Sequence, residues 1–159
     1  MIKKNLTILM IIIISLLFIT AGIYAKAAPD IINLNEPAYK KHKKGIVKFT
    51  HQKHQNEYAK EYPDLYKNNC GECHHDKGGK PLTKLKEGDD VQKCIECHKI
   101  PSERPKGKKA PKLNKKERLE YHAEAFHYNC KGCHKSFNKQ YKPKKAPTTC
   151  TKCHPKKKG

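Results

Sequence analysis

Apolar residues form one long run near the start of the chain, over residues 6–24, and only short patches after it. Two of these patches, residues 31–34 and 46–49, predict a β-hairpin. We expect a helix near residues 51–61, directly after the hairpin. Pro- and Lys-rich stretches such as residues 101–111 interrupt the rest of the chain and predict exposed loops.

A second helix is predicted over residues 114–129. Asn114 and Glu117 have the spacing of a capping box, which marks a helix start. The apolar residues of this segment recur at helical spacing on one face: Leu119, Ala123 and Phe126. The predicted fold class is therefore small α+β, mostly loops and short helices with an N-terminal hairpin.

The long apolar run has the features of an export signal. Lys3 and Lys4 precede it, and the small residues Ala25 and Ala27 follow it at the positions that a signal peptidase recognises. We expect residues 1–27 to be a signal peptide, cleaved after Ala27, and residues 28–159 to be one domain. The alternative is a retained anchor, because the run approaches the ~20 residues needed to span a bilayer.

The remainder is basic and poor in apolar residues. The formal charge of the full chain is +20, and it falls to +17 when the first 27 residues, with three Lys and no acid, are removed. The chain has no Trp and only four Phe. Such a composition buries too little surface to offset chain entropy. Either the chain is largely disordered, or a cofactor fills its interior.

The cysteines decide between these alternatives. All eight fall into four copies of Cys-x-x-Cys-His, the attachment signature of c-type haem. Residues three apart share a helical face, so both thiols can reach one porphyrin edge while the next residue, His, reaches the iron. The expected covalent sites are Cys70, Cys73, Cys94, Cys97, Cys130, Cys133, Cys150 and Cys153, and the motif histidines are His74, His98, His134 and His154.

Two other interpretations of the cysteines are weaker. The spacing between motifs fits paired Cys-x-x-Cys zinc sites, and an oxidising compartment would allow four local disulfides. Neither interpretation explains a His after every second Cys. A nucleic-acid-binding role for the basic chain is disfavoured by the export signal, so we expect no nucleic-acid partner.

Haem iron takes a second axial ligand, which sets its chemistry. Both Met residues, Met1 and Met10, lie in the signal, so His/Met ligation is excluded from the cleaved chain. Four of the six other histidines would complete bis-histidine ligation at four irons. These six are His42, His51, His54, His75, His122 and His127. Iron ligated on both sides has no open position, which predicts outer-sphere electron transfer, not an enzyme.

Local context narrows the choice of second ligands. His75 directly follows His74, so the two rings must serve different haems. His127 lies near the apolar face of the predicted second helix, which favours it over His122 as an axial ligand, although both stay open. His42 lies in a lysine cluster, and we expect it to be a solvated surface residue.

The arrangement resembles the class III cytochromes c, low-potential multihaem carriers of anaerobic bacteria, over residues 31–156. The resemblance is carried by residues 49–54, by the tandem His74-His75 and by a His shortly before the third motif. It implies four haem c groups with these axial pairs: His74 and His51, His98 and His75, His134 and His54, and His154 and His127. It also implies that Phe49 packs against haems 1 and 3. All four motifs are short here, whereas several relatives have longer second and fourth motifs.

The predicted function is a periplasmic electron carrier. The resemblance implies acidic redox partners such as hydrogenase or formate dehydrogenase, and membrane redox complexes. Membrane contact is expected only through an uncleaved signal segment, and the alternative function is a membrane-anchored quinol dehydrogenase. Seven lysines around the fourth motif predict a docking surface for an acidic partner: Lys142, Lys144, Lys145, Lys152, Lys156, Lys157 and Lys158.

Overall fold

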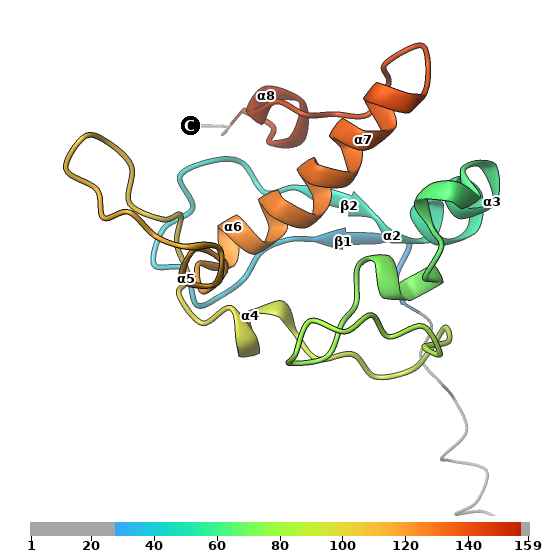
Figure 1. The fold of residues 1–159 in the computed structure, drawn as a ribbon, viewed down its shortest axis with the longest axis horizontal. Coiled ribbons are helices and arrows are strands. Elements are labelled where there is room, and N and C mark those ends of the chain that lie inside the picture. Colours follow the sequence, from blue (N-terminus) through green and yellow to red (C-terminus); the bar gives the residue numbers. More distant parts are fainter. Residues whose placement is uncertain (1–27, 157–159) are drawn as a thin grey trace, which may run out of the picture.

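The computed structural model describes residues 28–156. Its sheet has two antiparallel strands, β1 (Ile31–Asn33) and β2 (Lys48–Thr50), in which Ile32 lies opposite Phe49. The Leu34 N–H donates to the Val47 carbonyl at 2.9 Å and extends the ladder by one bond. The predicted hairpin is confirmed, with a long connection between its strands (Figure 1).

The first predicted helix is also confirmed. It follows β2 directly and consists of α2 (His51–Lys53), one wider π-helical turn η1 (His54–Tyr58) and α3 (Ala59–Glu61). Because it begins at the end of β2, its first residues are held beside the sheet. Short 3-10 turns, η2 (Pro63–Leu65) and η3 (Asn69–Glu72), lead from it into the first motif.

The second predicted helix is wrong in its extent. The capping box of Asn114 and Glu117 is present and starts α5 (Lys115–Leu119). The chain then breaks at Tyr121, which is extended (φ −79°, ψ 114°) and forms a parallel bridge with Ile100. The break is stabilised by the N–H of Ile100, which donates to the Glu120 carbonyl at 2.9 Å.

After the break, one continuous helical rod carries the chain through the third motif. It consists of α6 (His122–Phe126), the π-helical turn η4 (His127–Lys131) and α7 (Gly132–Gln140). Figure 1 shows this rod crossing the molecule, with α4 (Cys94–Cys97) and α8 (Cys150–Cys153) as isolated single turns on separate loops. The observed fold is thus the expected small α+β class, mostly loops.

The polypeptide does not make a conventional core. Among residues 28–156 no apolar side chain is buried, and the one buried polar side chain is His122. One small aromatic cluster joins Tyr62 after α3 to Phe137 of α7 and to Tyr141, with ring centroids 4.8 and 4.9 Å from that of Tyr62. Packing between protein side chains alone therefore holds the segments together only locally.

Within the described part of the chain, no helix is long and apolar enough to cross a bilayer. The expected signal peptide, residues 1–27, lies outside the described residues.

Candidate functional site

Each Cys-x-x-Cys-His motif is folded as a helical turn. In three motifs the histidine N–H donates to the carbonyl of the first cysteine, at 2.9 Å for His74, 2.9 Å for His98 and 2.7 Å for His154. The third motif lies in the helical rod of η4 and α7. All eight cysteines have free thiols. A helical turn places both thiols of a motif on one side of the chain, as attachment to one porphyrin edge requires.

The histidines are arranged in four pairs. Every pair combines one motif histidine with one histidine from elsewhere, and together the pairs contain all eight residues expected as axial ligands. The ring-centroid distances are 6.4 Å for His51 and His74, 6.0 Å for His75 and His98, 6.2 Å for His54 and His134, and 6.5 Å for His127 and His154.

These distances lie in the upper part of the range for aromatic pairs, and they also suit two rings that share one metal ion. An imidazole nitrogen binds a metal at about 2.0–2.1 Å, and the ring centre lies about 1 Å beyond it, so two rings on one metal have centroids about 6 Å apart. The four observed separations, 6.0–6.5 Å, match this geometry. The pairs could therefore hold one six-coordinate iron each.

Backbone carbonyls set the tautomer of most of these rings. Because a carbonyl oxygen only accepts hydrogen bonds, the ring nitrogen that binds it must carry the proton. The unprotonated Nε2 atom is then free to bind a metal through its lone pair. Five rings donate from Nδ1 in this way. The acceptors are the carbonyls of Thr50 for His54 (2.8 Å), Asp76 for His75 (2.7 Å), Leu119 for His98 (2.5 Å), Pro147 for His134 (2.7 Å) and Gly45 for His154 (2.9 Å).

Burial favours the neutral form that a metal ligand must have. Desolvation is the main cause that lowers the pKa of His54, His74 and His127 below the ordinary value for histidine. The Nδ1 atom of His51 is buried without a hydrogen-bond partner in the polypeptide. Paired imidazoles beside eight free thiols fit c-type haem in their donor chemistry.

Phe49 lies between two rings from different pairs. Its ring centroid is 5.8 Å from that of His51 and 4.8 Å from that of His54. Since His51 and His54 belong to the first and third pairs, Phe49 occupies the position expected for a residue that packs against two haems.

His122 and His42 lie apart from the four pairs. His122 is buried, 6% exposed, and its Nδ1 is 3.1 Å from the Tyr39 hydroxyl. Burial raises the pKa of Tyr39 to about 12, so this hydroxyl stays protonated at neutral pH. His42, expected to be a solvated surface residue, is partly exposed, and its ring stacks on Tyr39 with centroids 5.2 Å apart.

Sequence reasoning missed the groups that orient the rings, since backbone carbonyls carry no residue signature. Gly45 is the clearest example. A Cβ on Gly45 would lie 2.2 Å from the Pro155 carbonyl oxygen, so this close approach admits only glycine. The approach brings the Gly45 carbonyl to His154 of the fourth motif. A Gly before a β-prone run was the one visible signal.

Comparison with known proteins agrees with this geometry. A family model described as the class III cytochrome c family matches residues 29–154, which include all four motifs. Cytochrome c3 of Maridesulfovibrio salexigens is 34% identical over 138 residues, covering 82% of this chain and 98% of the relative. No solved structure matches the chain.

Proposed function

Because the chain belongs to the class III cytochrome c family, whose members are multihaem electron carriers, we propose that it is a periplasmic carrier with four c-type haems, each ligated by two histidines. The observation that carries this proposal is the set of four histidine pairs with centroids 6.0–6.5 Å apart.

Each haem is assigned two thiols and two imidazoles. Haem 1 is held by Cys70, Cys73, His74 and His51; haem 2 by Cys94, Cys97, His98 and His75; haem 3 by Cys130, Cys133, His134 and His54; and haem 4 by Cys150, Cys153, His154 and His127. The assignment of His127, and not His122, is supported by its separation from His154 and by the contact of His122 with Tyr39.

This ligation limits the chemistry to electron transfer. Two imidazoles bound to each iron would leave it no open position for oxygen or a substrate. Imidazole ligands, without the Met thioether that raises potentials, place the haems toward the low end of the potential range. Backbone carbonyls would orient five of the eight rings toward the irons.

The first prediction concerns haem number and location. Native protein from a periplasmic fraction should have the mass of residues 28–159 plus four haems by intact-mass spectrometry, because each of the four motifs would bind one haem through its two cysteines. Matched double variants, Cys94→Ala with Cys97→Ala and Cys150→Ala with Cys153→Ala, should each lose one haem mass. A native mass without added porphyrin, or protein found only in membranes, would contradict the proposal.

We further propose that the partners are acidic redox enzymes, such as hydrogenase or formate dehydrogenase, and membrane redox complexes. The support is a basic surface around the fourth motif, which we call the motif 4 lysines. Five of them lie in the described part of the chain and are exposed: Lys142, Lys144, Lys145, Lys152 and Lys156. A surface of one sign raises the encounter rate with a partner of opposite sign.

The second prediction tests this surface. The rate at which an acidic hydrogenase reduces the haems of this protein should fall about tenfold between ~10 mM and ~500 mM salt, because salt screens exposed charges. Changing Lys144, Lys145 and Lys152 to Gln should reproduce most of that loss at low salt. The matched control changes Lys77, Lys80 and Lys84, which follow the first motif, and should have little effect. Equal losses in the two triple variants would show net charge, not this surface, to be responsible.

A further inference from the structure

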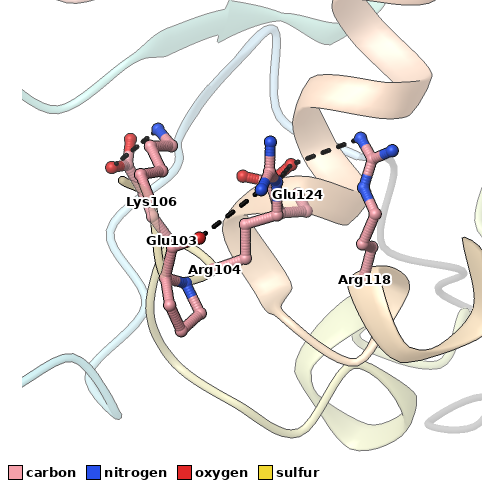
Figure 2. A network of polar contacts seen from close by, with 6 residues as sticks. Glu103, Arg104, Lys106, Arg118 and Glu124 are labelled. Carbon is pink, nitrogen blue, oxygen red and sulfur yellow. Dashed lines mark hydrogen bonds and ion pairs between the residues drawn. The ribbon is translucent and has the colours of Figure 1, made fainter. Parts of the chain in front are cut away.

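Glu124 of α6 is a nearly buried carboxylate between two arginines. Its side chain is 12% exposed, and its Oε2 atom lies 3.5 Å from Nε of Arg104 and 4.0 Å from Nη2 of Arg118. Figure 2 shows both guanidinium groups directed at this carboxylate from different segments. A second, partly exposed ion pair nearby joins Glu103 and Lys106 at 3.1 Å.

The choice of arginine at these two positions is specific. The chain has 35 basic residues, and only Arg104 and Arg118 are arginines, yet both contact the same carboxylate. A guanidinium cannot lose its charge in a protein and is more weakly hydrated than an ammonium group, so it suits pairs that are partly buried. Everywhere else the chain uses lysine, which suits solvated positions.

The cluster joins three segments at the break before α6. Arg104 lies in the loop after Ile100, Arg118 in α5 and Glu124 in α6. Backbone bonds lie at the same place: the His122 N–H donates to the Ile100 carbonyl at 2.9 Å. The first turn of α6 is therefore held from two sides, by main-chain bonds and by ion pairs, at its partly buried face.

Glu124 also lies one helical turn before His127, so its charge acts on that ring. Residues three apart on a helix are neighbours. The Glu124 carboxylate therefore lies in the helical turn next to the proposed ligand of haem 4.

We propose that Glu124, held by Arg104 and Arg118, is a positioning residue that acts through His127 to set the reduction potential of haem 4. This inference rests on the proposed ligation of haem 4 by His127. A negative charge beside the ligand stabilises ferric iron, which carries one more positive charge than ferrous iron, and the arginines oppose it. Glu124 is nearly buried, so its charge is little screened by solvent, whereas Arg118, with a side chain 50% exposed, is screened more strongly than Arg104 at 34%.

Charge variants of opposite sign test the proposal. Glu124→Gln should raise the potential of haem 4 and Arg104→Gln should lower it. Each change should shift the reduced-to-oxidised ratio about tenfold at fixed potential, which is ~59 mV for one electron. The double variant should return toward the wild-type value. Haem methyl resonances followed by NMR through a redox titration resolve the four haems.

The matched control is Glu57→Gln. Glu57 lies three residues from the proposed ligand His54 and pairs with Lys53, but its side chain is 65% exposed, so solvent screens it. This variant should leave the potential of haem 3 nearly unchanged. His127→Met identifies the resonances of haem 4, because a thioether ligand raises the potential of that haem alone.

The outcomes separate this inference from the proposed function. If His127→Met shifts no haem, the ligation itself is wrong. If it shifts haem 4 while Glu124→Gln and Arg104→Gln move that haem in the same direction or not at all, the charge role of the cluster is overturned. Loosening of the helix would move both variants in one direction and would not be reversed in the double variant.

Discussion

Without covalent haem, residues 28–159 are expected to behave as an unfolded chain. The physical reason is that no apolar side chain among residues 28–156 is buried by the polypeptide, so little burial offsets a conformational entropy cost of roughly 100 kcal/mol or more. The haems would supply the missing apolar surface and tie distant segments through paired imidazoles. A chain with all eight cysteines changed to Ala should lose essentially all its helical signal in far-UV circular dichroism and be degraded rapidly by protease.

The control for this loss is a variant that lacks one of the four haems. Changing Cys94 and Cys97 to Ala removes only haem 2 and should leave most of the dichroism, because the other three pairs still join the hairpin, the helical rod and the fourth motif. The cluster of Tyr62, Phe137 and Tyr141 is an aromatic contact that could hold residual structure. A compact, protease-resistant haem-free chain would show that this cluster and the hairpin suffice.

Local signals in the sequence predicted the local structure well. The hairpin follows from two β-prone patches, and the start of α5 follows from the capping box of Asn114 and Glu117, which is formed as expected. The break at Tyr121 could not be predicted, because it depends on the bridge to Ile100, about twenty residues earlier. A helical pattern records which residues can be helical, not which backbone groups bind a distant segment instead.

In the candidate site, too, some features could be predicted from the sequence and others could not. The motif histidines are visible in the sequence because their spacing is fixed by the porphyrin edge. The pairing of His54 with His134 joins residues far apart in the chain, and only the family resemblance suggested it. The carbonyls that orient the rings, such as those of Leu119 and Pro147, carry no side-chain signature at all. The stacking of His42 on Tyr39 also has no signal in the sequence, where His42 lies among lysines.

Removing the imidazole of His127 should convert one haem of four to a high-spin form that binds external ligands. The His127 and His154 rings are 6.5 Å apart, so we expect His127→Ala to open one axial position at haem 4. About a quarter of the haem signal should then change from low-spin to high-spin in visible absorption and electron paramagnetic resonance spectra. Added imidazole should restore the low-spin form. An open position also ends the restriction to outer-sphere electron transfer at this haem.

His122→Ala is the matched control for this assignment, because His122 lies on the same helix five residues earlier and is more deeply buried. Its Nδ1 faces the Tyr39 hydroxyl at 3.1 Å, and it is not paired with a motif histidine. The variant should therefore lose packing, with a cost of about 1–3 kcal/mol from the unpaired partner, yet keep four low-spin haems. High-spin haem in His122→Ala together with four low-spin haems in His127→Ala would reverse the assignment of the haem 4 ligand.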